Sequence, residues 1–497
     1  MLKRLHFTLP KTIFAIALLV LLIQFGFALS EYARHALAAV TFPFPLDYGE
    51  GPILDQVLRL AQSENIYRAE FATPPYTVSN YPPLFHLAQV PFALIFGPAF
   101  WYGRAISMVS ALLAALFIGL TLYTVTSDHI ASIAGGLTLL AFPYILQWSA
   151  FDRVDTLALA LSWAGLFAIV RWPDQRRGLA LSVMLLAAAV YTKQSYGLVV
   201  PATALVWLLQ GKRYRRALEV AGWLGGICLA SFLMLNWVTR GGFYFNIVTA
   251  NVNRFSHINI MAYLTEMFLK NWLLMLGAIL FMVVERWWYP TRSWPLVTPY
   301  VLLAALASLT VGKAGSSVNY LYEPASALCL AAGAILAWPG KTSKNYWLKT
   351  AVVLGLALQI NGMVTWSRAD YVPFVTSKVH MASDVAQLAQ IVRDAPGPVL
   401  ADEYMGLIPV AGRKLTFQPF EFSQLQQAGL WNADAMIASI KRQEFSAILL
   451  YEPPFGQPMI VTRWTPKIRT AIWANYEPLP TLTQTTLAYV WVYVPRK

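Results

Sequence analysis

The chain has 497 residues, of which 57% are hydrophobic and only 12% are charged. Soluble globular domains carry about twice that charged fraction, so the composition excludes an ordinary soluble enzyme and indicates a protein with many membrane-spanning helices. The net charge is +13, but the basic residues lie in short clusters between apolar runs, a pattern that suits membrane topology rather than nucleic-acid binding.

The first element is an apolar run at residues 12–29, which is preceded by Lys3, Arg4 and Lys11. Basic residues before an apolar run are also typical of a cleaved secretory signal. This run is long for a signal, however, and many more apolar runs follow it. We therefore expect an uncleaved first membrane span.

Apolar runs long enough to cross about 30 Å of hydrocarbon continue along the chain. We expect eleven spans, at residues 12–29, 101–125, 130–147, 155–171, 178–192, 196–210, 217–238, 267–284, 296–311, 320–338 and 347–366. A further apolar segment at 83–96 follows Pro82-Pro83 and is interrupted by polar residues and Pro91. It is predicted to be a helix that lies in the membrane interface rather than crossing the bilayer.

The basic residues support that interpretation of segment 83–96. If the segment does not cross, the basic clusters between the spans all fall on one face, which the positive-inside rule makes cytoplasmic. If it crossed, every later loop would invert and the clusters would be split between two faces. The clusters are Lys3, Arg4 and Lys11; Arg171, Arg176 and Arg177; Lys212, Arg213, Arg215 and Arg216; Arg286 and Arg292; and Lys341, Lys344 and Lys349. The N-terminus is therefore predicted to be cytoplasmic.

The opposite face would receive a long first loop at about residues 30–100 and everything after Trp366. In this tail, helical patterns at 382–394 and 433–442 alternate with β-rich runs at 398–401, 447–451 and 487–494. Such alternation predicts a small α/β domain outside the cytoplasm. We therefore expect a transmembrane domain at 1–366 and an extracytoplasmic domain at 367–497. Two acids of the tail, Asp402 and Glu403, follow a predicted strand and could contact the acceptor, but acids in such loops are usually solvated, and we expect that here.

The first loop contains an acidic segment in which Asp47 and Glu50 lie just beyond the first span. Carboxylates are costly to hold near lipid and often mark a functional site there. The alternative is a helix start, because Gly49, Gly51 and Pro52 favour a turn into a helix near residue 53 and acids favour a helix N-terminus.

Polar residues also interrupt four later loops on the same predicted face. They are Asp152, Arg153 and Asp155; Lys193 and Gln194; Asn251, Asn253 and Arg254; and Lys313, Asn319, Tyr320 and Glu323. The first three of these groups have a structural alternative: charges paired with each other, a lysine that reaches toward water, and an interfacial helix. In the fourth group, the glycines and serines beside Lys313 could form an anion-binding turn. Together they place carboxylates and cations in five outer loops, which is what transfer from a phosphate leaving group requires.

These motifs make the chain resemble the GT-C membrane glycosyltransferases, in the branch of the protein O-mannosyltransferases and lipid A aminoarabinose transferases. The resemblance covers residues 10–210 best. It is carried by Asp47-Tyr48-Gly49-Glu50, by Tyr81-Pro82-Pro83-Leu84, by Gly97 and Arg104 before the second span, and by Arg153-Val154-Asp155. It implies an all-α polytopic fold with interfacial helices in the first loop and, often, an added extracytoplasmic domain.

The resemblance also implies a reaction, the transfer of a sugar from a polyprenyl-phosphate donor to an acceptor on the outer face. The catalytic acid of the family lies in an Asp-Glu pair of the first loop. Here that pair is split into Asp47 and Glu50, and either residue is a candidate for the base. Tyr81 stands where many relatives have a lysine or histidine, so a needed cation would come from Arg153, Lys193 or Lys313.

The expected enzyme is an inverting glycosyltransferase of the cell membrane. Arg153 and Lys193, with Lys313 or Arg254, would hold the phosphate, and the wider predicted substrate-binding set is Tyr81, Arg104, Asp152, Asp155, Gln194, Asn319, Tyr320 and Glu323. Expected partners are the lipid-linked sugar, a glycan, lipid or protein acceptor and membrane lipids, without nucleic acid. No cofactor is expected, and a divalent metal is not required because the cations can neutralise a monophosphate.

Two other classes of function stay open. A transporter or flippase of lipid-linked sugars would share the charged pocket, but it would be expected to show inverted repeats or paired broken spans, which the sequence does not show. A non-catalytic scaffold for envelope assembly is the third alternative, and the charges on the outer face argue against it.

Overall fold

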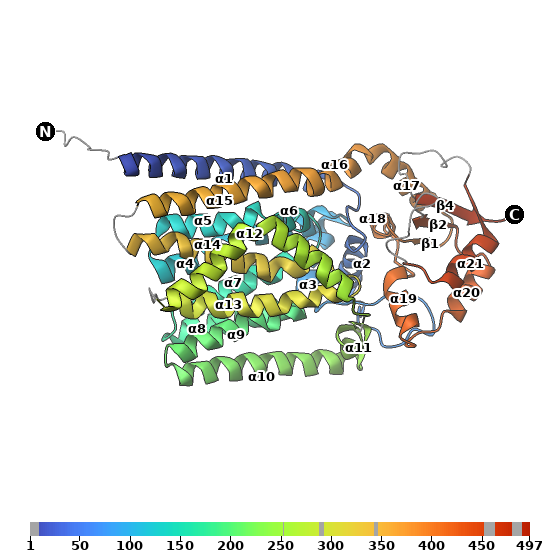
Figure 1. The fold of residues 1–497 in the computed structure, drawn as a ribbon. Coiled ribbons are helices and arrows are strands. Elements are labelled where there is room, and N and C mark those ends of the chain that lie inside the picture. The colour runs from blue at the N-terminus through green and yellow to red at the C-terminus, as the bar shows by residue number, and fades with distance from the viewer. Residues whose placement is uncertain (1–8, 252, 288–292, 342–345, 452–462, 480–489) are drawn as a thin grey trace.

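A computed structural model describes residues 9–251, 253–287, 293–341, 346–451, 463–479 and 490–497. It shows a long bundle of helices with a smaller region of helices and strands at one end (Figure 1). The first helix begins at the opposite end of the bundle, and the last strand lies in the smaller region. The predicted fold class, a polytopic helical bundle with an α/β region near the C-terminus, is confirmed.

Each predicted apolar run overlaps a helix of the bundle. The bundle helices are α1 (Leu9–Thr41), α4 (Trp101–Thr126), α5 (His129–Ala141), α6 (Pro143–Trp148), α7 (Asp155–Arg171), α8 (Arg176–Thr192), α9 (Val199–Gln210), α10 (Tyr214–Val238), α12 (His257–Trp287), α13 (Trp294–Ser308), α14 (Tyr322–Lys341) and α15 (Tyr346–Trp366). The run at 130–147 is divided between α5 and α6 because Phe142 adopts the extended backbone that the following Pro143 favours.

Seven described helical segments are long and apolar enough to cross a membrane by themselves. They are Leu9–Thr41, Trp101–Thr126, Tyr214–Val238, His257–Trp287, Trp294–Gly312, Val318–Ala337 and Tyr346–His380. The other predicted spans are the α5–α6 pair and the shorter helices α7, α8 and α9, which have 17, 17 and 12 residues. The protein is therefore a multi-pass membrane protein, and the number of eleven crossings stays a prediction.

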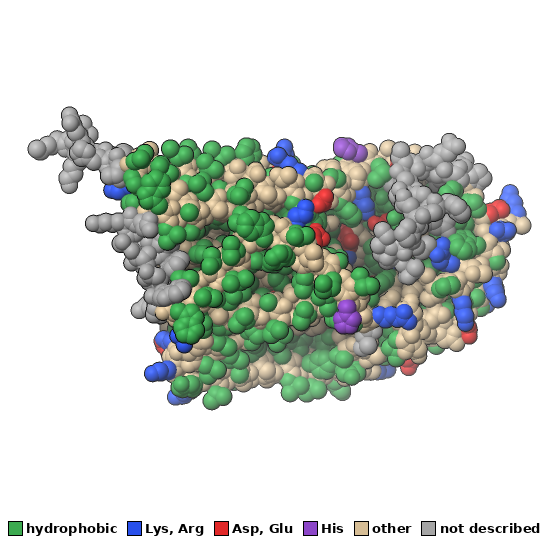
Figure 2. All heavy atoms as spheres, viewed as in Figure 1, with side chains coloured by type: hydrophobic (Ala, Val, Ile, Leu, Met, Phe, Trp, Pro, Cys, Tyr) green, Lys and Arg blue, Asp and Glu red, His purple; other side chains and the backbone are tan. Residues whose placement is uncertain are grey.

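Small residues let the central helices approach each other closely. A Cβ added at Gly136 of α5 would lie 2.6 Å from the Ala115 carbonyl oxygen of α4, and one added at Gly333 of α14 would lie 2.8 Å from the Ala131 carbonyl oxygen of α5. Both positions therefore require glycine, as is common where membrane helices cross. The face of the bundle seen in Figure 2 is largely hydrophobic, which suits contact with lipid.

The first loop (residues 42–100) folds against one end of the bundle. It contains α2 (Glu50–Ala61) and α3 (Leu84–Phe96), which agree with the helices expected near residue 53 and at 83–96. Ile53 and Leu54 of α2 are buried with Phe85 of α3 in one apolar cluster. Other loops carry α11 (Gly242–Ile247) and the short turns η1 (Gln194–Gly197), η2 (Thr249–Asn251), η3 (Leu309–Gly312) and η4 (Val318–Leu321).

The C-terminal region (residues 367–497) contains a four-stranded sheet in the order β1-β2-β4-β3. β1 and β2 are parallel, and β4 is antiparallel to both β2 and β3. The elements are η5 (Ser367–Tyr371), α16 (Val372–His380), α17 (Ala382–Asp394), β1 (Val399–Ala401), α18 (Leu407–Val410), α19 (Pro419–Gln427), α20 (Asp434–Lys441), β2 (Ala447–Tyr451), α21 (Pro466–Asn475), β3 (Tyr476–Pro478) and β4 (Val490–Pro495). The helices and strands predicted for the tail are present; residues 487–489 of the last predicted strand lie outside the described residues.

The C-terminal region packs directly on the first loop. The Leu415 N–H donates to Asp55 Oδ1 at 2.9 Å, and Arg59 Nη2 donates to the Leu415 carbonyl at 3.0 Å. The Val78 N–H donates to Gln418 Oε1 at 2.8 Å. These bonds fix the C-terminal region over one end of the bundle. The proposed domain boundary at residue 366 stays a prediction.

Candidate active site

A cavity of about 570 Å³ lies between the end of the bundle and the C-terminal region. In Figure 2, charged side chains gather where these two parts meet. Seven of the residues predicted from sequence line this cavity: Asp47, Tyr81, Arg153, Lys193, Gln194, Lys313 and Tyr320. They come from segments that are far apart in the chain, and the fold brings them to one place.

Asp47 lies in the first loop with its carboxylate at the cavity wall. Its Oδ2 accepts a hydrogen bond from the Gly49 N–H at 2.8 Å and forms an ion pair with Arg153. A side chain at position 49 would displace the Arg153 guanidinium, because an added Cβ would lie 2.0 Å from it. Asp47 Oδ1 has no hydrogen bond to another described residue, so it is available to a ligand in the cavity.

Glu50 is fully buried behind the cavity wall. Its Oε1 accepts from Arg104 Nε and from the Asp152 N–H, both at 2.8 Å. Its Oε2 accepts from Arg104 Nη2 at 2.8 Å and from the Leu46 N–H at 2.7 Å. Burial acts to raise the pKa of Glu50, but the Arg104 guanidinium and the other donors outweigh burial and hold the pKa below its usual value. Glu50 and Arg104 therefore anchor the loop, and neither lines the cavity.

Asp152 is also buried, and it does not line the cavity. Its Oδ1 accepts a hydrogen bond from Gln89 Nε2 at 2.9 Å, whereas its Oδ2 has no partner among the described residues. Burial and the nearby charge of Glu50 raise the pKa of Asp152 well above its usual value. This side chain therefore favours the neutral acid form and supports the wall from behind.

Asp155 organises a second group of predicted residues. Its Oδ1 accepts from Lys193 Nζ at 2.5 Å and from Asn319 Nδ2 at 2.9 Å, and its Oδ2 accepts from Trp148 Nε1 at 2.8 Å. Lys193 Nζ also lies 4.6 Å from the ring centroid of Tyr320, a cation–π contact. Burial acts to lower the pKa of Lys193, but the charge of Asp155 outweighs it and raises the pKa above its usual value. Lys193 is thus a stable cation at the cavity wall.

Lys313 is a cavity cation with no carboxylate partner in the part of the chain that the structure describes. Its Nζ donates to Asn251 Oδ1 at 3.1 Å. Burial, together with the nearby charge of Lys193, lowers the pKa of Lys313 to about 8. A partly desolvated ammonium without a counter-ion favours an anionic ligand.

Besides Glu50, Arg104, Asp152, Asp155 and Asn319, two more predicted residues do not line the cavity. Arg254 is exposed and does not line it, whereas its neighbours Asn251 and Asn253 do. Glu323 accepts a hydrogen bond from the Tyr300 hydroxyl inside the bundle. In both segments other side chains line the cavity: Asn251 and Asn253 near Arg254, and Lys313 and Tyr320 near Glu323.

Gln194 and Tyr81 meet at the wall formed by the first loop. Gln194 Nε2 donates to the carbonyl of Asn80 at 3.1 Å, and Asn80 also lines the cavity. Burial raises the pKa of Tyr81 to about 12, so its hydroxyl stays protonated and can donate a hydrogen bond.

The C-terminal region contributes side chains that sequence reasoning missed. Phe420, Glu421 and Arg463 line the cavity. The Tyr48 hydroxyl donates to Glu421 Oε2 at 2.8 Å, and the Arg463 guanidinium lies 4.3 Å from the Tyr48 ring centroid. Glu421 could not be singled out from the sequence, because it follows Pro419 at a helix start, where acidic residues are common. Arg463 could not be singled out either, because it belongs to no local sequence pattern. Of these residues, only Tyr48 has a signal in the sequence, because it lies inside the acidic segment.

Among the described residues, no three His, Cys, Asp or Glu side chains are grouped in a way that could hold a metal ion. The cations that line the cavity are the side chains available to neutralise a phosphate there. The expectation that they suffice without a metal stays a prediction.

Comparison with known proteins identifies relatives of this fold. Residues 80–238 match the family described as dolichyl-phosphate-mannose-protein mannosyltransferase. The crystal structure of ArnT from Cupriavidus metallidurans bound to undecaprenyl phosphate superposes with a TM-score of 0.62 at 14% identity, covering 94% of this chain and 97% of that chain. No curated protein sequence matches the chain.

An archaeal oligosaccharyltransferase has the same architecture. AglB from Archaeoglobus fulgidus, in complex with an inhibitory peptide and a dolichol-phosphate, gives a TM-score of 0.50 at 13% identity, covering 85% of this chain and 69% of that chain. At such low identity these likenesses show the fold. The chain therefore has the fold of these membrane proteins, and its residues 80–238 match the mannosyltransferase family in sequence.

Proposed function

We propose that this protein transfers a sugar from a polyprenyl-phosphate donor to an acceptor hydroxyl in the cavity. The observation that carries the proposal is the carboxylate of Asp47, with Oδ1 open, in the same cavity as Arg153, Lys193 and Lys313. The ArnT structure contains undecaprenyl phosphate and the AglB structure contains a dolichol-phosphate, which supports a lipid phosphate as the donor here.

Asp47 is the base in this proposal, and Glu50 is not. Both oxygens of Glu50 already accept hydrogen bonds, and the side chain is fully buried. Asp47 Oδ1 is open to the cavity, while Arg153 and the Gly49 N–H hold Oδ2 in place. A base needs a free lone pair within reach of the proton it accepts, and Asp47 meets that condition.

The phosphate is assigned to the end of the cavity that contains Lys313. Arg153 is paired with Asp47, and Lys193 is paired with Asp155, so Lys313 supplies the unbalanced positive charge. Lys193 lies close enough to Lys313 to lower its pKa, and Arg153 Nε has no partner among the described residues. These groups would stabilise the charge that grows on the phosphate as it leaves.

The proposed step conserves atoms and charge. The acceptor hydroxyl gives its proton to Asp47 Oδ1 while its oxygen attacks C1 of the sugar on the face opposite the phosphate. The bond between C1 and the phosphate oxygen breaks, and its electron pair stays on the phosphate, which remains attached to the lipid. The configuration at C1 is therefore inverted, and a positioned base contributes about 10² to 10⁴ in rate.

Transfer on the outer face of the membrane is part of the proposal. α8 carries Arg176 and Arg177 at one end and is followed by Lys193 of the cavity at the other, so the basic clusters and the cavity lie at opposite ends of the bundle. Of the basic residues used for topology, Lys3, Arg4, Arg292 and Lys344 and the side chain of Lys341 lie outside the described residues.

The test replaces Asp47 with Asn in a strain that lacks the native gene. The wild-type chain should restore the missing envelope sugar, and Asp47→Asn should leave it missing while the lipid-linked sugar accumulates, both measured by mass spectrometry. Asp174→Asn is the matched control, because Asp174 is exposed at the other end of the bundle and pairs with Arg213. Full restoration by Asp47→Asn would overturn the assignment of the base.

A separate experiment distinguishes transfer from the alternative function, a transporter or flippase. In vesicles, a flippase would move the lipid-linked sugar between leaflets without forming a new glycosidic bond, and Asp47→Asn would not be expected to stop it selectively. No feature of the described residues favours that alternative over transfer.

A further inference from the structure

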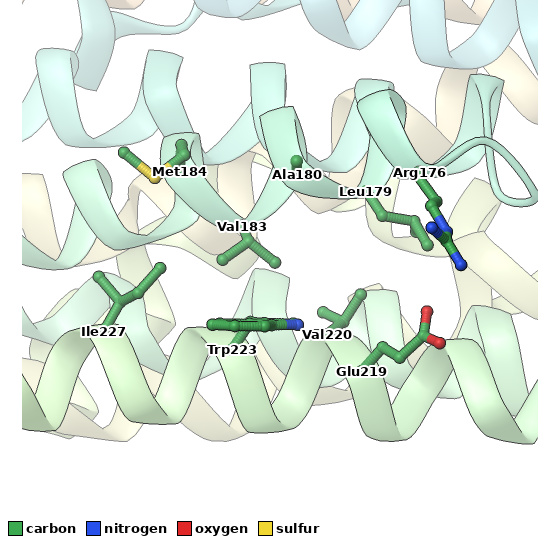
Figure 3. A pocket seen from close by; sticks show the side chains of 9 residues that line it. All are labelled: Arg176, Leu179, Ala180, Val183, Met184, Glu219, Val220, Trp223 and Ile227. Carbon is green, nitrogen blue, oxygen red and sulfur yellow. The ribbon is translucent and has the colours of Figure 1, made fainter.

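A second hollow lies far from the active-site cavity, between α8 and α10. It has a volume of about 460 Å³, and Figure 3 shows its side chains on the two helices. Seven of the residues that line it are apolar: Leu179, Ala180, Val183, Met184, Val220, Trp223 and Ile227. Arg176 and Glu219 lie together at one end (Figure 3). We call this hollow the α8–α10 groove.

The length of the α8–α10 groove matches one leaflet of a bilayer. On each helix it extends over eight residue steps, from Arg176 to Met184 and from Glu219 to Ile227. At 1.5 Å per residue this is about 12 Å, and half of the hydrocarbon thickness is about 15 Å. The groove therefore begins at the basic end of the bundle and ends near its middle.

The groove is open to the surroundings of the bundle because α10 is packed so lightly. Only 6% of the most apolar stretch of α10 is buried, and Ala217 and Val220 are its buried residues. A Cβ added at Gly222, Gly225 or Gly226 would meet no atom within 4 Å. In a membrane this apolar space must be filled, and the groups available to fill it are acyl chains.

The charge at the open end of the groove is strongly positive. The end of α7, the first turns of α8 and α10 and the loop before α10 contain seven cations: Arg171, Arg176, Arg177, Lys212, Arg213, Arg215 and Arg216. Arg213 is paired with Asp174, and Glu219 is paired with both Arg215 and Arg216. In the described part of the chain, the other four cations have no carboxylate partner. Figure 2 shows basic side chains at this end of the bundle.

We propose that the α8–α10 groove binds one anionic phospholipid from the leaflet at the basic end of the bundle. An acyl chain lies against Val183, Trp223 and Ile227, and the phosphate lies between Arg176 and Arg177. A zwitterionic lipid carries no net charge to match the four unpaired cations, so the site selects an anionic headgroup. This lipid would fasten α10, whose own contacts with the bundle are few.

The test measures lipid retention on the full-length protein. The protein is reconstituted with equal amounts of phosphatidylglycerol and phosphatidylcholine, and native mass spectrometry counts the lipids that stay bound. The wild-type chain should retain phosphatidylglycerol preferentially. Arg176→Gln with Arg177→Gln should reduce that preference by between about 5-fold and about 30-fold, since each basic residue near the surface contributes about a factor of five to binding an anionic lipid.

Two further variants separate the groove from general charge effects. Ala180→Trp fills the apolar part without altering any charge, and it should also abolish the preference, because Ala180 is exposed on the groove wall. Arg286→Gln with Lys349→Gln is the control, because it removes the same charge from α12 and α15 instead. Equal loss in this control, or no preference in the wild-type chain, would overturn the proposal. Displacement of phosphatidylglycerol by equimolar undecaprenyl phosphate would show a site for lipid carriers and would overturn the phospholipid assignment.

Discussion

Asp47 and Glu50 show how the surroundings of a carboxylate decide what it can do. The two acids are three positions apart, yet one faces the cavity and the other accepts five hydrogen bonds inside the protein. Arg153 and Arg104 are their respective partners. The first pair lies at the cavity wall, and its acid keeps one oxygen without a partner among the described residues, whereas both oxygens of the acid in the second pair accept hydrogen bonds. We therefore expect substitution of Asp47 to abolish transfer and substitution of Glu50 mainly to lower the stability of the protein.

Glu50→Gln should lower stability more than it alters the chemistry. It removes the charge that balances the buried Arg104, and breaking a buried ion pair costs about 3–5 kcal/mol. The measurement is the thermal unfolding temperature of the protein in detergent, and replacing both partners, as in Glu50→Leu with Arg104→Met, should recover part of the loss. If Glu50→Gln kept the wild-type unfolding temperature and still abolished transfer, Glu50 rather than Asp47 would be the base.

Lys313 should give donor binding a pH dependence in the alkaline range. Burial and the charge of Lys193 lower its pKa to about 8, so its ammonium is present below that pH and is lost as the pH rises through it. The KM for the lipid-linked donor should therefore rise above about pH 8. Lys313→Arg should remove this dependence, because arginine stays charged, and Lys313→Met should raise KM at every pH. A KM that is flat to pH 10 in the wild-type chain would contradict the assignment.

Elements of the C-terminal region hold the loop that carries Asp47. Lys378 Nζ, at the end of α16, donates to the Leu46 carbonyl at 2.9 Å and to Glu403 Oε1 at 3.0 Å. Glu403 also pairs with Arg463 at 2.6 Å. Burial acts to raise the pKa of Glu403, but these two cations outweigh burial and lower it to about 2. The expectation that Glu403 is solvated was therefore wrong, and the same holds for the buried Asp402.

The contact between α19 and Tyr48 should set how well Asp47 is positioned. The Tyr48 hydroxyl donates to Glu421 at 2.8 Å and accepts from the Phe420 N–H at 3.2 Å. Tyr48→Phe and Glu421→Ala should each lower kcat by about tenfold, in line with one lost hydrogen bond of about 1–1.5 kcal/mol, with little effect on the KM for the donor. Glu421→Gln keeps an acceptor for the hydroxyl and should retain most of the activity. Loss of activity in Glu421→Gln equal to that in Glu421→Ala would mean that the charge of Glu421, not its hydrogen bond, matters.

At the scale of the whole molecule, hydrophobic patterning predicted the helices well because each span must satisfy its backbone internally and present apolar side chains to lipid. The distribution of basic clusters likewise predicted that the polar loops meet at one end, and Asp47, Arg153, Lys193 and Lys313 do line one cavity. These features depend on composition within a segment. The pattern of apolar and basic residues along the chain is therefore enough to predict them.

The parts that could not be predicted depend on contacts between distant segments. The choice between Asp47 and Glu50 depends on Arg104, which lies 54 positions beyond Glu50 and is buried against it. Glu421 and Arg463 enter the cavity only because the C-terminal region packs on the first loop. No periodicity within either segment encodes that contact, so their positions follow from the tertiary fold.

The docking of the C-terminal region on the first loop also orders the events of biosynthesis. The first loop is made before all but one of the bundle helices, whereas Leu415 and Gln418, which satisfy Asp55 and Val78, are made after the whole bundle. Since chains emerge from the N-terminus onward, the loop that carries Asp47 stays without these partners until the bundle is in place. We therefore expect the reactive loop to mature last, so that a chain interrupted before residue 415 would insert into the membrane without becoming a competent enzyme.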